Sequence, residues 1–267
     1  MSIKIKDFIS ILPGMEQLPT DTVDGYICGN PEILITGVAI TFLATIEHCY
    51  KAYQHNCNII ISHEGIWYHH KEQQLDVIGH ATKDPVYFKK KAFFQEQGIT
   101  LYRYHDGIHK ALPDRITAGL IKTLGWTHKE IAQFPAYSIV ELDGTLGSLI
   151  QYIKDTLHLP WVRYIGKKEQ PIGRVLVAVG YRGNGSLLLP IIAKEKIDLV
   201  IYGEGPEWEI PEYCRDAQTL NLGTALIILG HGASESPGME LLADELRAQF
   251  QDIPIYYFPF QNPFLVG

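Results

Sequence analysis

Short apolar runs alternate along the chain with longer amphipathic stretches. The run 58–62 (NIIIS) is continuously apolar apart from its ends, which is typical of a strand buried on both faces. A Lys-rich stretch begins at Pro85 and ends near Gly98, the proline-first, glycine-last arrangement expected of a helix. Read this way, the pattern predicts strands at 37–40, 58–62, 99–105, 137–142, 174–179, 199–202, 225–229 and 253–258. It predicts helices at 45–55, 85–98, 116–124, 146–157, 187–196 and 236–250.

This alternation predicts an α/β fold with largely parallel sheets flanked by helices. The middle of the chain behaves as a second unit, with soft boundaries near 125–135 and 203–221. The stretch 203–219, rich in Pro, Glu and aromatic residues, is expected to be irregular. Ser236 and Pro237 are expected to form the cap and first turn of the last helix.

Composition narrows the class of protein. The chain has 267 residues, of which 46% are apolar and 20% charged, so it has enough apolar surface for one large or two modest globular domains. A net charge of -7 argues against a nucleic-acid partner, although a small anion held by a metal stays compatible with it. The four cysteines show no CxxC spacing and are expected to be reduced thiols. No apolar run is long enough for a membrane helix and no signal core opens the chain, so we expect a cytoplasmic protein without a membrane partner.

Candidate chemistry gathers at the ends of three predicted strands. His63 and Glu64 follow 58–62, His105 and His109 end or follow 99–105, and a His–Glu pair follows 225–229. Open α/β sheets bind ligands at the carboxyl ends of their strands. If the three strands are parallel neighbours, the three clusters meet at one edge of one sheet.

Imidazole and carboxylate groups bind Zn, Fe, Mn or Ni ions. The five candidate ligands are His63, Glu64, His109, His231 and Glu235. Five such groups are too many for one tetrahedral ion and suit two ions that share a carboxylate, a pair that can activate water and polarise a phosphoryl or carbonyl oxygen. The alternative is that these histidines merely cap strand ends, which is the more common role for any one of them alone.

Two further motifs are candidate ligand-binding sites. His69 and His70 form a rival ligand pair, but they lie past the strand beside Lys71, and we expect them in an exposed loop. The glycine-rich segment 180–186 follows a strand and opens a helix, where backbone N–H groups can bind an anion, with Arg182 as a further contact. Its spacing is not GxGxxG and no GK[ST] follows, so a tight turn is the favoured interpretation.

The three clusters, in this order, resemble the NIF-three-like dinuclear-metal family, which includes the GTP cyclohydrolase type-two homologues. The similarity runs over nearly the whole chain, through the segments DTVDG, VAIT, IISHE, LYRYHDGIH, VAVGYRGNGS and ILGHGASESPGMELLADEL. The family pattern has His-His where this chain has His63-Glu64, and a metal-binding Asp where it has His109. Its final His and Glu match His231 and Glu235. The two departures exchange ligand types and leave three imidazoles and two carboxylates.

The resemblance implies two α/β domains with mixed sheets and a ring-like homo-hexamer. It implies a metal-binding domain at 1–130, completed by 220–267, and an inserted domain at 131–219. Two divalent transition-metal ions suit this ligand set, and Glu235 is then the candidate bridge. His105 is then a candidate catalytic proton shuttle or a partner that supports a ligand.

The leading hypothesis is a metal-dependent hydrolase acting on a small nucleotide-like or phosphorylated substrate. The alternative is a metal-binding scaffold or regulatory protein without turnover, favoured by the altered ligand set. A third is a protein that has lost the metal and keeps only the fold. Metal content separates the third hypothesis from the other two.

Overall fold

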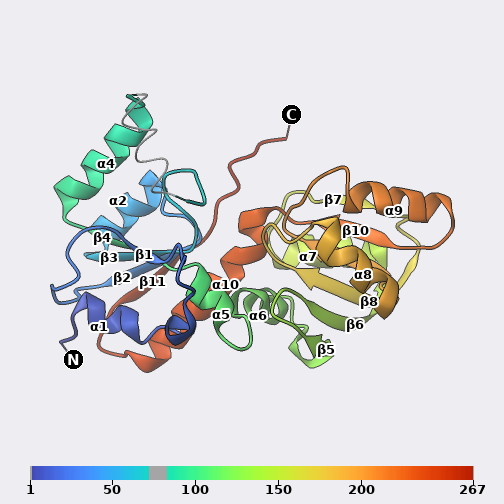
Figure 1. The fold of residues 1–267 in the computed structure, drawn as a ribbon, viewed down its shortest axis with the longest axis horizontal. Coiled ribbons are helices and arrows are strands. Elements are labelled where there is room, and N and C mark those ends of the chain that lie inside the picture. The colour runs from blue at the N-terminus through green and yellow to red at the C-terminus, as the bar shows by residue number, and fades with distance from the viewer. Residues whose placement is uncertain (1, 72–82, 267) are drawn as a thin grey trace. The chain divides into compact units, whose positions relative to one another are not determined.

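The computed structural model describes residues 2–71 and 83–266, which form two compact units (Figure 1). The first unit spans Met1–Arg115 and Met239–Gln261, and the second spans Ile116–Gly238 and Asn262–Gly267. Each is a mixed sheet flanked by helices, which confirms the predicted α/β class. Within the described ranges, no helix is both long and apolar enough to cross a membrane.

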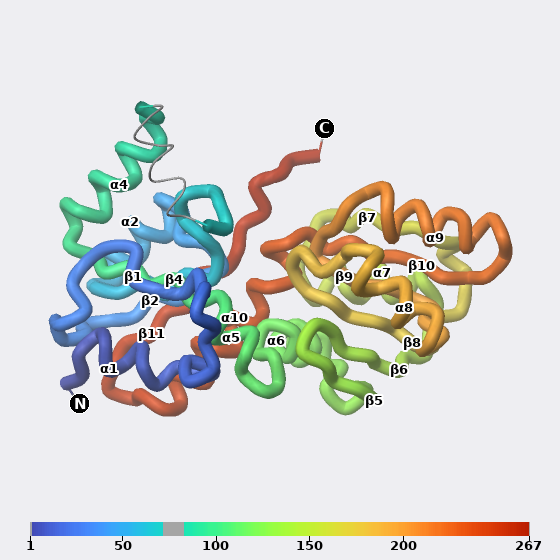
Figure 2. Tube along the Cα trace, in the orientation of Figure 1, coloured from blue at the N-terminus to red at the C-terminus, as the bar shows by residue number. Residues whose placement is uncertain are grey.

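The first unit is built on a five-stranded sheet in the order β1-β4-β3-β2-β11. The strands are β1 (Gly25–Cys28), β2 (Val38–Thr41), β3 (Ile59–Ser62), β4 (Thr100–Arg103) and β11 (Ile255–Phe258). The four strands from β4 to β11 run parallel, and β1 closes one edge antiparallel to β4. Although β11 comes from the far end of the chain, it pairs with β2 and completes this sheet (Figure 2).

Helices cover both faces of this sheet (Figure 1). They are α1 (Ile5–Ser10), α2 (Ile46–Gln54), α4 (Pro85–Gln97) and α5 (Asp106–Lys110), with a short turn η1 (Met15–Gln17). On one face α2 and α4 bury Cys49 and Phe94 against the strand residue Ile60. On the other face Phe8 of α1 packs on Phe250, with ring centroids 5.0 Å apart. The burial of β3 on both sides explains its continuous apolar run.

The second unit holds a six-stranded sheet in the order β5-β6-β8-β9-β10-β7. Its strands are β5 (Glu130–Gln133), β6 (Ser138–Thr145), β7 (Arg163–Ile165), β8 (Pro171–Ala178), β9 (Leu199–Tyr202) and β10 (Ala225–Ile228). Its helices are α6 (Arg115–Thr123), α7 (Leu146–Thr156), α8 (Gly185–Glu195) and α9 (Ile210–Thr219), with the turn η2 (Thr127–Lys129). β8, β9 and β10 run parallel in the centre, and α8 and α9 bury Leu188 and Cys214 in a common core with Leu226 of β10.

The helix α10 (His231–Gln249) starts in the second unit and ends in the first. Its first part is fixed by a close approach to α6: a Cβ added to Gly119 would lie 2.4 Å from the Cα atom of Gly238. Only two glycines allow the backbones to come this near. This crossing sets the position of the first turns of α10, which carry His231 and Glu235.

Several predictions from the sequence are wrong in detail. β10 lies beside β9 in the second sheet, so it is not a neighbour of β3 in one sheet. The stretch expected to be irregular contains α9, whose Ile210, Cys214 and Ala217 are buried at helical spacing. α10 begins at His231, before the expected cap, and Pro237 lies inside it. Residues 116–130 and 220–238 group with the second unit, and the division into domains at 1–130 with 220–267 and at 131–219 stays a prediction.

Candidate metal centre

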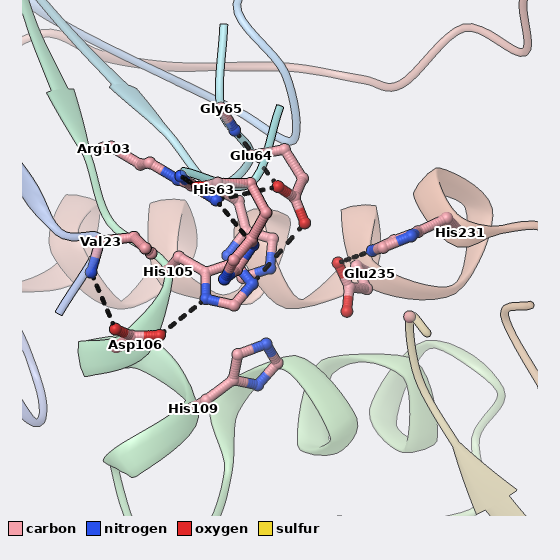
Figure 3. A network of polar contacts seen from close by, with 12 residues as sticks. Val23, His63, Glu64, Gly65, Arg103, His105, Asp106, His109, His231 and Glu235 are labelled. Atoms are coloured by element: carbon pink, nitrogen blue, oxygen red, sulfur yellow. Dashed lines mark hydrogen bonds and ion pairs between the residues drawn. The ribbon is translucent and has the colours of Figure 1, made fainter. Parts of the chain in front are cut away.

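The site in the first unit begins where two neighbouring parallel strands end. Ser62 of β3 is in register with Arg103 of β4, and the N–H of Tyr104 donates to the Ser62 carbonyl at 2.8 Å. The next residues, His63 and His105, therefore leave the sheet at the same edge (Figure 3). His63 is fully buried there. The expected meeting of these two clusters at one sheet edge is what the register produces.

Three imidazoles gather at this edge. The rings of His63 and His105 stack with centroids 4.7 Å apart, and His109 stands edge-on to both at 5.1 Å. One ring nitrogen from each lies within 4.8 Å of the others, so the three residues could hold a metal ion. His109 comes close because α5 turns the chain back: its backbone N–H bonds the His105 carbonyl, one helical turn earlier.

Each of these rings has an acceptor at Nδ1. His63 Nδ1 lies 3.2 Å from the Tyr104 carbonyl, and His105 Nδ1 lies 2.9 Å from the Asp106 carboxylate. His109 Nδ1 lies 3.1 and 3.2 Å from the two oxygens of Asp114, a buried side chain. Since carbonyls and carboxylates only accept, the proton of each neutral ring sits on Nδ1 and the lone pair on Nε2. Metal-binding histidines typically show this arrangement.

Asp24 holds the turn that carries His105. Its carboxylate accepts the backbone N–H groups of His105, Asp106 and Gly107 at 2.7, 2.7 and 2.8 Å. Asp24 belongs to the early DTVDG segment, to which the sequence assigned no role. Its contact partners lie 81 to 83 residues away in the chain, so no local sequence pattern could reveal the contact.

Asp106 is tied down in the same way. The hydrogen bond from His105 holds the pKa of the Asp106 carboxyl well below its usual range, outweighing burial, which acts in the opposite direction. The Val23 N–H and the Thr22 hydroxyl also donate to it and lower the pKa further. Asp106 therefore stays ionised and keeps accepting from His105 Nδ1 (Figure 3).

Glu64 is oriented by a buried arginine. Arg103, with only 1% of its side chain exposed, donates from Nη2 to Glu64 Oε2 at 3.1 Å, and the Gly65 N–H donates to the same oxygen at 3.2 Å. The other oxygen, Oε1, faces His105 Nε2 at 3.6 Å. Two ligands of one tetrahedral ion lie roughly 3.3 Å apart, given bond lengths of about 2.0–2.1 Å. Glu64 therefore lies near enough to the imidazoles to be a candidate ligand at this edge.

The structure adds His70, which the sequence placed in an exposed loop. The loop is exposed as expected, yet ligand atoms of Glu64, His70 and His105 lie within 4.8 Å of one another. His69 instead takes the Lys71 N–H at Nδ1, at 2.9 Å, and stays in its own loop. Of the rival pair, only the second histidine approaches the site.

The second unit holds the pair His231 and Glu235 at the start of α10. His231 Nε2 lies 3.0 Å from Glu235 Oε2, and His231 Nδ1 lies 2.9 Å from Glu204 Oε1. A neutral imidazole has one N–H, so with a carboxylate at each nitrogen it must either be protonated or share a cation with one of them. Because Glu235 is only 3% exposed, its carboxylate depends on a nearby positive charge to offset the cost of burial.

Gly180 makes room for this pair. Its φ is +58°, and an added Cβ would lie 2.0 Å from Glu235 Oε1 and 3.2 Å from His231 Nε2. Its N–H donates to the Ser234 hydroxyl at 2.9 Å. The glycine-rich segment 180–186 therefore supports the His–Glu pair directly.

The same segment does not present an open anion site at the start of α8. The Asn184 side chain accepts the Leu187 N–H at 3.0 Å, and the Glu209 carboxylate accepts the Gly185 N–H. Arg182 donates to the Thr117 hydroxyl and the Ala136 carbonyl, both at 3.3 Å. A carboxylate of the protein thus occupies the position that a phosphate would need, in agreement with the tight-turn interpretation.

The family model described as Duf34/NIF3 (NGG1p interacting factor 3) matches residues 4–263. A protein of Clostridium acetobutylicum named GTP cyclohydrolase 1 type 2 homolog is 24% identical over 96% of this chain and 94% of its own length. A hypothetical protein of Staphylococcus aureus aligns with a TM-score of 0.75 at 19% identity over 100% of both chains. A Bacillus cereus protein related to NIF3 aligns with a TM-score of 0.74 at 15% identity, over 100% of this chain and 99% of its own. At these identities the solved structures show the same fold.

Proposed function

Because the chain belongs to the DUF34/NIF3 family, we propose that it is a metal-dependent hydrolase that holds two divalent transition-metal ions. Its substrate is a small nucleotide-like or phosphorylated molecule. One observation carries the proposal: three imidazoles share a sheet edge, one ring nitrogen of each lies within 4.8 Å of the others, and each Nδ1 faces an acceptor.

His63, His105 and His109 hold the first ion in this proposal. Their mutual closeness favours a ligand role for His105 over the proton-shuttle role expected from the sequence. Glu64 binds the second ion through Oε1, since Arg103 and Gly65 engage Oε2. His231 and Glu235 would supply the remaining ligands, and Glu235 would be the shared carboxylate. Their support is the 3.0 Å His–Glu contact, in which a bound cation satisfies both groups.

When bound, such ions lower the pKa of coordinated water and polarise a phosphoryl or carbonyl oxygen. The protein's own part is to keep the ligands in place. Asp106 and Asp114 fix the ring orientation of two histidines, and Asp24 fixes the turn between β4 and α5. Arg103 keeps Glu64 extended toward His105. Because strand ends and buried partners already hold these ligands, they lose little conformational entropy when an ion or substrate binds.

The name of a relative, GTP cyclohydrolase 1 type 2 homolog, supports the proposed substrate class. GTP carries both features that a pair of cations at this edge can act on, a phosphate chain and a ring carbon open to attack by water. We therefore propose GTP and related nucleotides as the first compounds to test. By family resemblance we also propose that the chain assembles as a homo-hexamer.

The test combines metal content with turnover. Elemental analysis of purified protein is expected to find two transition-metal ions per chain, and a His63→Ala, His109→Ala double variant is expected to lose the first. The metal-loaded protein is then incubated with GTP and a panel of phosphorylated compounds, following loss of purine absorbance and release of phosphate. Full metal content without turnover on any compound would support the alternative, a metal-binding scaffold. An empty wild-type chain that cannot be reloaded would refute both.

A further inference from the structure

Two buried cations hold the loop that follows Glu64. Lys90 of α4, 2% exposed, donates from Nζ to the Ile66 carbonyl at 2.8 Å and lies 4.9 Å from the centre of the Tyr68 ring. Arg103, 1% exposed, donates from Nη1 to the His70 carbonyl while its Nη2 binds Glu64. Charged hydrogen bonds of this kind are stronger than neutral ones, and buried charges depend on them. The backbone of His70 is therefore fixed next to Glu64, although its side chain is exposed.

The His70 ring faces His105. Their centroids lie 5.1 Å apart at an interplanar angle of 76°, and Glu64, His70 and His105 form a second group of ligand atoms within 4.8 Å. Two imidazoles and one carboxylate make a common donor set for Zn, Fe and Mn. His105 belongs to both this group and the three-imidazole group, but its single Nε2 lone pair can bind only one ion at a time.

We propose that His70 is a ligand of the second ion, binding it together with Glu64. This inference rests on the proposed two-ion site and adds a ligand to it. His105 stays with His63 and His109, where its ring stacks on the buried His63. His63 and His105 also bring a ligand atom near Glu64, but the proposal assigns both to the first ion. Among the described residues of the first unit, His70 is the remaining histidine whose ligand atom lies within 4.8 Å of one from Glu64.

One contact must change for His70 to bind an ion. Arg103 Nη2 lies 3.3 Å from His70 Nδ1, so the guanidinium is the donor and Nδ1 the acceptor. The distance is at the long end of the hydrogen-bond range. Arg103 keeps Glu64 and the His70 carbonyl as acceptors when an ion replaces it at Nδ1. The arginine thus holds the ring in place in the ion-free protein and keeps its other two acceptors when the ion arrives.

The experiment is a calorimetric titration of the full-length, metal-stripped chain with ZnCl₂, comparing wild type, His70→Ala, His69→Ala and His109→Ala. The His69→Ala variant is the matched control, because it removes a neighbouring exposed imidazole whose Nδ1 contacts Lys71. Wild type and His69→Ala are expected to bind two ions per chain. His70→Ala is expected to keep one and bind the other at least about 100-fold more weakly, since even partners outside the ligand shell cost 10–100-fold. Far-UV circular dichroism checks that each variant is folded.

The outcomes separate this inference from the proposed function. A folded His70→Ala variant that binds two ions as tightly as His69→Ala overturns the role of His70. A wild-type chain that binds one ion, lost in His109→Ala and kept in His70→Ala, also overturns it but leaves the three-imidazole site standing. A wild-type chain that binds no Zn²⁺ overturns the proposed function and this inference together.

Discussion

The contact between Asp114 and His109 offers a sharp test of the three-imidazole site. Asp114 is not a proposed ligand, yet its two oxygens lie 3.1 and 3.2 Å from His109 Nδ1. One N–H shared between two oxygens amounts to a single charge-assisted hydrogen bond, which contributes about 1.5–3 kcal/mol. If that energy holds the ring in its ion-binding orientation, its loss weakens metal affinity by roughly 10- to 100-fold, since about 1.4 kcal/mol is tenfold.

Two substitutions divide this effect. Asp114→Asn keeps one oxygen acceptor and removes the charge, so Zn²⁺ affinity is expected to fall about tenfold. Asp114→Ala removes acceptor and charge, and the expected loss is about 100-fold. Calorimetric titration of the metal-stripped variants measures both, with Asp155→Asn on the exposed face of α7 as the control. A folded Asp114→Ala variant with wild-type affinity for both ions would refute the claim that Asp114 orients a metal ligand.

Four further predictions concern stability, thiols and assembly. Gly180→Ala is expected to lower the free energy of unfolding, measured by urea titration, by about 2 kcal/mol or more, because a left-handed φ costs about 1–2 kcal/mol and the new Cβ would also meet Glu235. Gly223→Ala is the control: its φ is +80° and its Cβ would enter open space, so the same titration should show the cost of the φ angle alone. Burial raises the pKa of Cys49, Cys57 and Cys214 to about 12 each, so native protein at pH 8 should react with iodoacetamide first at the half-buried Cys28, as read by mass spectrometry. Because the pKa values of these thiols are raised in the folded protein, the buried thiols contribute their full stability below the unfolded thiol pKa of about 8.5. That contribution is lost as pH rises toward 12, so the midpoint of urea unfolding should fall across this pH window. Light scattering of the purified chain should give the mass of six chains, and a monomer at micromolar concentration would remove the hexamer proposal.

Elements with strong local signals could be predicted from the sequence. The helix α4 has Asp84 as its cap, Pro85 in its first turn and Gly98 in a left-handed conformation at its end, and all three signals are local. The start of α10 could not be predicted in this way. Pro237 usually marks a first turn, but here it lies inside the helix, in a buried stretch where tertiary packing outweighs the local preference.

Sheet membership was the larger difficulty. The run 225–229 is typical of a buried strand, and the structure confirms it as β10. An apolar run does not, however, indicate which strands pair with it. Pairing with β9 and β7 places β10 in the second sheet. The prediction that all three clusters follow strands of one sheet therefore failed, whereas β3 and β4 do meet as expected.

The candidate site shows the same division between local and distant signals. His63, His105 and His109 were found because polar residues at strand ends stand out in sequence. The residues that hold these histidines could not be found from the sequence. Tyr104 contributes only a backbone carbonyl, and Asp24 holds a turn that lies 81 to 83 residues away in the chain. His70 was set aside because its own position is exposed, and only the buried side chain of Arg103 explains why it approaches the site.

These partners also bear on the alternative that the histidines merely cap strand ends. A capping ring is satisfied once one nitrogen has bonded a nearby backbone group, and its other nitrogen is free to face water. Here the Nδ1 atoms are engaged by Tyr104, Asp106 and Asp114, and ligand atoms of the three rings turn toward one another within 4.8 Å. Electron-rich nitrogens brought together at a buried edge repel one another unless a positive charge lies among them. A bound cation would offset the cost of this arrangement, and for that reason Asp114 is a more decisive residue to mutate than any single histidine.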